Sequence, residues 1–415
     1  MRVALVYDRV NKWGGAERVL LALHKLFPDA PLYTSVYDNK KALWAKVFDI
    51  RTSFLQKFPF SKHHELYALL MPIAFESFFS QGGSASGGNF DEYNLVISVT
   101  SEAAKGIITK PKTKHICYCL TPTRYLWSGY DEYFKNPVLK FLSKPAVSYL
   151  KFWDKIAAQR PDSYIAISKE AKRRIKEYYN RDSEVVYPPL MFEENFARQP
   201  RVSDDARLQN SENQQLNPAS LNKIRRQAET QPNFSSSESG LSRYFLIVSR
   251  LVPYKRIDLA IKTFNKLGLS LKIVGTGSEL AKLKAMAKGN IEFLGNLTDG
   301  ELVSYYSECR ALIFPGVEDF GLTILEAQSF GKPVIAFRGG GAQETIIDPS
   351  TGSGSATGIF FDKQTVESLE TAIEQFNNLT IKPGDCIRQA EKFSFETFKK
   401  QFMNAINNID SNLAI

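Results

Sequence analysis

Two acidic residues, Glu318 and Glu326, lie eight positions apart in a segment that could bind an anion. The segment reads Pro-Gly-Val-Glu-Asp-Phe-Gly-Leu-Thr-Ile-Leu-Glu and follows the apolar run 311–314, which predicts a short buried strand. Apolar residues recur at helical spacing after Gly321, so we expect a turn and then a helix, whose first N–H groups attract phosphate. Those groups would come from Phe320, Gly321 and Leu322, with Thr323 beside them. An ordinary helix with an acidic first turn would show the same pattern.

Two cations in the segment 249–255 could grip a diphosphate. Arg250 directly follows an apolar strand pattern and can fork onto two phosphate oxygens, while Lys255 can act as a point charge. Glycine turns end other predicted strands and would let a ligand approach the backbone closely. These turns are Val274-Gly275-Thr-Gly277, Leu294-Gly-Asn-Leu297 and Gly339–Thr345. Together they predict one ligand-binding edge of a sheet.

The sequence carries no Asp-x-Asp metal motif at a predicted strand end, so we expect no metal and no other cofactor. The helix N–H groups and the two cations would neutralise a departing diphosphate instead. The four cysteines are scattered and suggest neither a zinc site nor a disulfide framework.

Alternating strand and helix patterns predict an α/β fold with parallel, doubly wound sheets. A first strand, Val3–Tyr7, leads into Gly14 and Gly15 and then a helical pattern over 16–26. We expect further strands at 32–37, 95–99, 115–119, 163–167, 185–187, 245–248, 271–274, 291–294, 311–314 and 334–337.

A change of composition divides the chain. We expect a first Rossmann-like domain over 1–190, a second over 242–392, and a last helix, about 393–415, that returns to the first domain. Residues 191–241 are rich in Ser, Asn, Gln and charge, which predicts a low-complexity, disordered insertion at the hinge.

The Glu318–Glu326 segment resembles the Glu-x7-Glu motif of glycosyltransferase family 4, whose members are retaining enzymes of the GT-B fold. The resemblance covers residues 1 to about 190 and about 244 to the C-terminus. It implies two facing Rossmann-like domains with a cleft between them. It also implies that Glu318 acts at the donor sugar and that Glu326 binds the nucleotide ribose.

The resemblance assigns further contacts. Arg250 and Lys255 would hold the donor pyrophosphate, Leu297 would meet the base through main-chain atoms, and Gly14–Gly15 would face the donor. The segment Thr121-Pro-Thr-Arg-Tyr-Leu-Trp127 is similar to the family's acceptor-side segment, which implies Thr121, Arg124 and Tyr125 as acceptor contacts. Leu120 stands where the family has a histidine, so a histidine-assisted role is in doubt.

A net charge of +9 favours acidic partners, of which nucleotide phosphates and an anionic membrane surface rank above nucleic acid. Aromatic residues alternate with lysines over 125–160, and a second basic helical pattern covers 169–176. Solvated helix faces with inward-packed aromatics and a peripheral membrane surface are both consistent with this pattern. The absence of a signal-peptide core and of long apolar runs predicts a cytoplasmic protein, with the inner membrane face as an alternative location.

The sequence therefore predicts a retaining, metal-independent hexosyltransferase that moves sugar from a nucleotide diphosphate sugar to a glycan or lipid-linked acceptor, with mannose as the leading sugar. Two alternatives stay open. One is a nucleotide-sugar epimerase or phosphorylase on the same fold, and the other is a catalytically silent protein that binds a sugar nucleotide or glycan.

Overall fold

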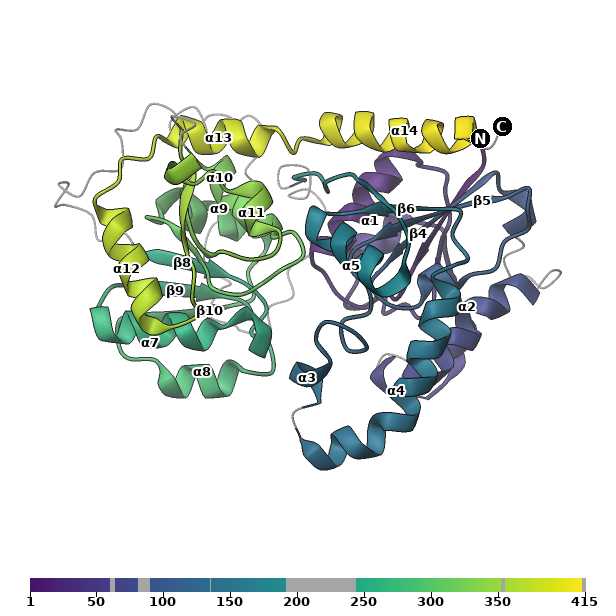
Figure 1. Cartoon of the computed structure of the whole chain (residues 1–415), viewed down its shortest axis with the longest axis horizontal. Helices are drawn as coiled ribbons and strands as arrows, with labels where there is room; N and C mark the ends of the chain where they lie inside the picture. The colour runs from purple at the N-terminus through teal and green to yellow at the C-terminus, as the bar shows by residue number, and fades with distance from the viewer. Residues whose placement is uncertain (60–63, 81–89, 135, 192–243, 352–354, 413–415) are drawn as a thin grey trace. The chain divides into compact units, whose positions relative to one another are not determined.

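The computed structural model describes residues 1–415 except 60–63, 81–89, 135, 192–243, 352–354 and 413–415 (Figure 1). It divides into two compact units, residues Met1–Pro189 with Phe395–Ile415, and residues Leu190–Ser394. The insertion predicted at 191–241 falls almost wholly outside the described residues. None of the helices in the described part of the chain is long and apolar enough to cross a membrane.

The first unit is built on a seven-stranded parallel sheet of order β3-β2-β1-β4-β5-β6-β7. Its strands are β1 Val3–Tyr7, β2 Leu32–Thr34, β3 Ile50–Thr52, β4 Leu95–Thr100, β5 Lys114–Cys119, β6 Ser163–Ala166 and β7 Glu184–Val185. Its α-helices are α1 Gly15–Leu26, α2 Met71–Ser80, α3 Tyr130–Tyr133, α4 Pro137–Ala157, α5 Lys169–Tyr179 and α14 Phe395–Asn412. Short 3₁₀ turns are η1 Leu43–Val47, η2 Phe54–Lys57, η3 His64–Leu70, η4 Phe90–Glu92 and η5 Ala104–Gly106.

The second unit is built on a six-stranded parallel sheet of order β10-β9-β8-β11-β12-β13. Its strands are β8 Phe245–Val248, β9 Leu271–Val274, β10 Ile291–Gly295, β11 Leu312–Phe314, β12 Val334–Phe337 and β13 Gly358–Phe361. Its α-helices are α7 Ile257–Leu267, α8 Leu280–Met286, α9 Asp299–Glu308, α10 Leu322–Ser329, α11 Ala342–Thr345, α12 Val366–Asn377 and α13 Pro383–Glu391. The 3₁₀ turns are η8 Pro253–Lys255 and η9 Pro349–Thr351.

Both faces of the second sheet are buried. Phe245 and Ile247 of β8 belong to one apolar cluster, whereas Leu246 between them belongs to another. A strand covered on both sides reads as a continuous apolar run, which is why the run 245–248 could be recognised in the sequence.

The prediction of parallel α/β domains is confirmed, with two edge strands missed. β3 and β13 lie at the ends of their sheets, and neither was expected. The predicted strands 32–37 and 185–187 are shorter, at Leu32–Thr34 and Glu184–Val185. The N-terminal half of α14 packs in the first unit, where the rings of Phe398 and Phe402 contact Tyr118.

Both sheets change direction of winding beside their first strand. The connections lead from β1 outward through β2 and β3, and then back across β1 to β4, and the second unit repeats this order from β8 to β11. Ligands of open parallel sheets bind where neighbouring connections diverge in this way, at the carboxyl ends of the strands. The loops after β8 and β11 are therefore the place to look for a site in the second unit, and the loops after β1 and β4 in the first.

Candidate active site

Lys255 and Glu318 meet at the switch point of the second sheet. Lys255 ends the turn η8 after β8, Glu318 lies in the loop after β11, and the Lys255 Nζ contacts Glu318 Oε1. The lysine side chain is 9% exposed and the glutamate side chain 24% exposed. The two loops touch through their backbones as well. A Cβ at Gly316 would lie 2.7 Å from Lys255 Cα, so a larger residue would push the loops apart.

Arg250 joins this pair through a tyrosine. Its guanidinium donates to the Tyr254 hydroxyl over 2.7 Å, and the Lys255 ammonium lies 5.2 Å from the centroid of the same ring. Arg250 itself is exposed, as a group that receives a ligand from solvent must be. Sequence reasoning gave Tyr254 no role. The only feature of the sequence that could have suggested a contact between Tyr254 and Arg250 is their spacing of four residues.

The glycine loop after β12 holds the main chain of Glu318. Gly341 N–H donates to the Glu318 carbonyl over 2.9 Å. Gly340 has φ +60°, and a Cβ there would lie 2.1 Å from the same carbonyl oxygen. Only glycine fits so close an approach. The backbone of the carboxylate-bearing loop is therefore held by its neighbour.

Gly321 begins α10 beside Glu318. It has φ +89° and provides no side-chain cap, so the helix starts with backbone N–H groups and no capping hydroxyl or carboxylate. Phe320 is buried, while Leu322 and Thr323 are half-buried. The predicted strand, turn and helix are thus present, and α10 begins four residues after Glu318.

The loops after β9 and β10 complete the same edge of the sheet. Gly275 N–H donates to the Gly295 carbonyl over 2.6 Å. Gly275 has φ +131°, and a Cβ there would stand 1.9 Å from the Ser249 carbonyl oxygen. Leu297 is half-buried against the apolar cluster of this side of the sheet. The structure therefore brings the predicted donor contacts Gly275 and Leu297 to the edge that carries Arg250.

Glu326 lies deeper than the other candidates. The residue is 2% exposed, and its Oε2 accepts the Tyr306 hydroxyl of α9 over 2.8 Å. The Tyr306 ring is stacked on Phe330, with an angle of 4° between the planes. If Glu326 contacts a ribose, it does so while its Oε2 accepts the hydrogen bond from Tyr306. Sequence reasoning missed this tyrosine, because nothing in α9 marks one residue as a partner of α10.

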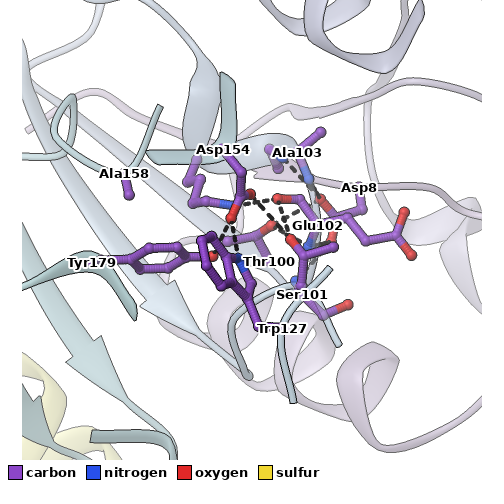
Figure 2. A network of polar contacts seen from close by, with 12 residues as sticks. Asp8, Thr100, Ser101, Glu102, Ala103, Trp127, Asp154, Ala158 and Tyr179 are labelled. Atoms are coloured by element: carbon purple, nitrogen blue, oxygen red, sulfur yellow. Dashed lines mark hydrogen bonds and ion pairs between the residues drawn. The ribbon is translucent and has the colours of Figure 1, made fainter. Parts of the chain in front are cut away.

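The switch point of the first sheet is filled by a side chain of the protein itself. The Asp8 carboxylate, directly after β1, accepts the Thr100 hydroxyl and the N–H groups of residues 101–104 at 2.8–3.0 Å (Figure 2). Burial raises the pKa of Asp8, and the nearby Glu102 raises it further, while these backbone N–H groups oppose the rise. N–H groups clustered in this way form an anion site. Asp8 therefore occupies the anion site of the first unit.

The glycine pair after β1 stands beside a carboxylate rather than a cation. A Cβ at Gly14 would lie 3.2 Å from Glu17 Oε2, and the Glu17 carboxylate accepts the buried Tyr7 hydroxyl over 2.6 Å. Gly15 begins α1. Arg9 forms a 2.6 Å ion pair with Glu102 across the two loops of the switch point. The Glu17 carboxylate is 1% exposed, so it holds the start of α1 against β1.

A second buried carboxylate, Asp154 of α4, holds the predicted acceptor segment. It accepts from Lys105 at 2.6 Å, from the Trp127 indole at 2.8 Å, and from Thr123 at 3.1 Å (Figure 2). Tyr179 donates to the same carboxylate over 2.8 Å. Asp154 therefore attaches the segment 121–127 to α4 through Thr123 and Trp127.

The acceptor candidates differ in exposure, and Thr121 is buried. Arg124 and Tyr125 are half-buried, and Thr121 lies 3.4 Å from the Arg174 guanidinium. Burial and the charge of Glu102 raise the pKa of Tyr125, so its hydroxyl stays protonated and can donate a hydrogen bond. His115 is buried within β5 and bonded to Ser98 at 2.8 Å, in keeping with the absence of a histidine role.

Comparison with known proteins finds a family match for most of the second unit. Residues 230–393 match the family model "Glycosyl transferases group 1". The chain is related to group 1 glycosyltransferases through its second unit. A curated relative, an uncharacterized glycosyltransferase of Methanocaldococcus jannaschii, is 30% identical over 36% of this chain and 44% of its own length.

Another curated relative of this glycosyltransferase-like chain is a GDP-mannose-dependent alpha-(1-6)-phosphatidylinositol monomannoside mannosyltransferase of Mycolicibacterium smegmatis. It is 31% identical over 30% of this chain and 36% of its own length. The chain thus matches less than half the length of either curated relative. Family and relatives support the prediction of an enzyme of the glycosyltransferase class.

Solved structures extend the likeness in fold to nearly the whole chain. HepE of Anabaena in complex with UDP-glucose has a TM-score of 0.63 at 18% identity, and the match covers 98% of this chain and 100% of that one. Sucrose-phosphate synthase of Thermosynechococcus elongatus has a TM-score of 0.66 at 13% identity, over 99% and 100% of the two chains. At these identities the likeness shows the fold alone, which is that of glycosyltransferases with two Rossmann-like domains.

Proposed function

We propose that this protein transfers a hexose from a nucleotide diphosphate sugar to a glycan or lipid-linked acceptor, with retention at the anomeric carbon and without a metal ion. The observation that carries the proposal is the Lys255–Glu318 ion pair at the switch point of the second sheet, with Glu318 four residues before the start of α10. One carboxylate for a sugar and one ammonium for a phosphate stand in contact there. A glycosidic bond to phosphate needs such a pair of charges.

The charges of the site match the charges that develop during transfer. As the bond from the anomeric carbon to the phosphate oxygen breaks, negative charge grows on the diphosphate and positive charge on the sugar ring. Arg250, Lys255 and the first N–H groups of α10 would stabilise the diphosphate. Glu318 would bind sugar hydroxyls and stabilise the positive ring.

Retention follows if the acceptor attacks from the side of the departing phosphate. The acceptor oxygen forms its bond to the anomeric carbon on the face that the phosphate leaves, and its proton passes to the leaving phosphate oxygen. Glu318 is bound to Lys255, which makes it a poor candidate for a covalent nucleophile and favours this single-step course. Thr121, Arg124 and Tyr125 would contact the acceptor, and Glu326 the donor ribose.

Metal independence is supported by side chains that can supply the positive charge a metal ion would otherwise supply to the diphosphate. The cations Arg250 and Lys255 already supply positive charge at the edge of the sheet.

Mannose is the donor sugar that we propose. It is supported by the curated relatives named as GDP-mannose-dependent mannosyltransferases of Mycolicibacterium smegmatis and Corynebacterium glutamicum. GDP-mannose, UDP-glucose and UDP-N-acetylglucosamine should therefore be compared as donors, each with its sugar labelled.

The test is turnover of the labelled donor, with and without a chelator. We expect release of the nucleotide diphosphate from GDP-mannose, by slow hydrolysis or by transfer to membrane lipid extract, at the same rate in EDTA. Activity that is lost in EDTA and restored by magnesium or manganese would refute metal independence. Release of an epimerised sugar would favour the epimerase alternative, and tight binding without any turnover would favour a silent binding protein.

A further inference from the structure

Helix α4 of the first unit carries an exposed apolar face along its whole length. Residues 138, 142, 145, 149, 152 and 156 follow one another at intervals of four, three, four, three and four, which places them on one side of a helix. Exposures on and beside this stripe are 65% for Val138, 69% for Phe141, 67% for Leu142 and 68% for Phe152. Soluble proteins seldom expose so many large apolar side chains together.

The opposite side of α4 is fixed to the first unit. Val147, Leu150 and Ala157 are buried there, and Asp154 is bonded to Lys105 and Trp127. The Trp153 indole donates to Glu76 of α2 over 2.8 Å. Trp153 packs inward against the core of the first unit, as the interpretation of inward-packed aromatics expected, whereas Phe141, Tyr149 and Phe152 are exposed. Figure 1 shows α4 as a long helix extending beside the first sheet.

Four lysines run along one flank of the apolar face. Lys140, Lys144, Lys151 and Lys155 are spaced by four, seven and four residues, so they form a row of their own. Asp154 is the only acidic residue between 137 and 157, and it is buried. Lys140 is paired with Asp131 of α3 over 2.6 Å, so the exposed surface of α4 combines apolar side chains with a row of lysines of which this one has an acidic partner.

The other basic helix, α5, differs. Arg173 is bonded to Glu170 and Glu177, Arg174 to Glu170, and Lys176 to Asp182, while Ile175 and Tyr179 are buried. Three of its cations are therefore paired with acids of the same unit, and its apolar side chains face inward, so α5 is a solvated helix face. The contrast with α4 rests on partners and exposure, which a count of lysines could not reveal.

We propose that the exposed face of α4, defined as Val138, Phe141, Leu142, Tyr149, Phe152 and Ile156 with the lysine row, lies on an anionic membrane surface. A helix of this kind buries its apolar side chains at the level of the lipid headgroups while its lysines meet lipid phosphates. A second copy of this chain is the less suitable occupant. Its α4 would present the same lysine row, and the exposed acid beside that row, Asp131, is already paired with Lys140.

This surface is joined to the predicted acceptor segment. Asp154 of α4 holds Trp127 and Thr123, and Lys151 lies 5.4 Å from the centroid of the Trp127 ring. If the proposed function holds, docking of α4 would place the segment 121–127 near the membrane, where a lipid-linked acceptor resides. That last step rests on the proposed function, whereas membrane docking itself does not.

Vesicle binding tests the docking. The full chain should bind vesicles of phosphatidylcholine mixed with phosphatidylglycerol and bind phosphatidylcholine vesicles weakly. Phe141→Ser, Leu142→Ser and Phe152→Ser together should lower the partition coefficient about tenfold or more. Lys140→Gln with Lys144→Gln should lower it about fivefold per lysine, whereas the matched change Lys41→Gln with Lys112→Gln, at exposed positions elsewhere on the unit, should have little effect.

A local probe identifies the face that docks. All four native cysteines are buried, so an environment-sensitive fluorophore can be attached to Phe152→Cys and, as a control, to Val47→Cys. We expect a shift of emission on anionic vesicles for the first label only. Equal binding to neutral vesicles, no binding, or an equal shift at Val47 would overturn the proposal, as would a dimer that forms through α4 without vesicle binding. Nucleotide affinity of the same variants, measured without vesicles, tests the donor site separately.

Discussion

Lys255 Nζ contacts Glu318 Oε1 across the two loops that flank the switch point of the second sheet. The two residues come from different strand ends, and the close approach of Gly316 to the backbone of Lys255 holds their loops together. Each charge is stabilised by the other before any ligand binds. If the proposed function holds, a donor enters a site whose carboxylate and ammonium are already positioned, which lowers the cost of organising them during transfer.

Glu318→Ala should lower turnover and spare affinity for the sugar-free nucleotide diphosphate. The carboxylate is proposed to act on the sugar, and its removal leaves Lys255 available to phosphate. Single-turnover rates and the dissociation constant of GDP measure the two effects. Normal turnover in this variant would mean that the acidic residues only begin a helix.

Arg250→Ala should weaken binding of the nucleotide diphosphate in the ground state. Loss of one hydrogen bond to a charged group costs about 1.5–3 kcal/mol, or roughly tenfold to a hundredfold in affinity. Arg250 is exposed, so the free energy of unfolding should change little. Arg256→Ala provides a control, because that arginine is directed to Asp258 and Gln364. Equal losses of affinity in both variants would argue against a specific role for Arg250.

Tyr254→Phe should weaken binding of the nucleotide diphosphate less than Arg250→Ala does. The change removes the hydroxyl that Arg250 contacts at 2.7 Å and keeps the ring beside Lys255. A net hydrogen bond contributes about 1 kcal/mol, so we expect roughly fivefold weaker binding of GDP. Isothermal titration of GDP measures it. Tyr305→Phe on α9 removes a hydroxyl elsewhere in the unit and should leave the affinity unchanged.

His115 should make the fold less stable in acid. Burial lowers the pKa of His115 to about 3, so the unfolded chain, with the usual histidine pKa near 6.5, takes up the proton first. Stability is then constant above about pH 6.5 and decreases as the pH falls from there toward about 3. At pH 5 the loss from this residue would be about 2 kcal/mol.

Denaturant unfolding at pH 7 and pH 5 checks this prediction in the native protein and in His115→Gln, which lacks the titrating ring. Carboxylates titrate in both proteins, so only the difference between them reports on His115. An equal loss of stability in the two proteins would show that the buried imidazole does not couple folding to pH.

Sequence alone determined the strands that lie inside the sheets and the residues at their ends. A central strand such as Phe245–Val248 is covered on both faces, so all its residues are apolar and the strand can be recognised as a continuous apolar run. Because parallel strands end at one edge, the sequence also predicted that Arg250, Lys255, Gly275 and Glu318 would share an edge, and the structure brings them there. Of the four strands at the ends of the sheets, β7 and β10 were predicted and β3 and β13 were missed, although β13 is as long as β8.

Tertiary structure alone decided which side chains face one another. Nothing local to Tyr306 marks it as the donor to Glu326, and nothing local to Asp8 marks it as the occupant of an anion site. The same limit applies to α4 and α5, whose basic patterns look alike although only α4 leaves its apolar side exposed. Helical and strand periodicity is set by neighbouring residues along the chain, whereas burial and pairing are set by which distant elements pack together.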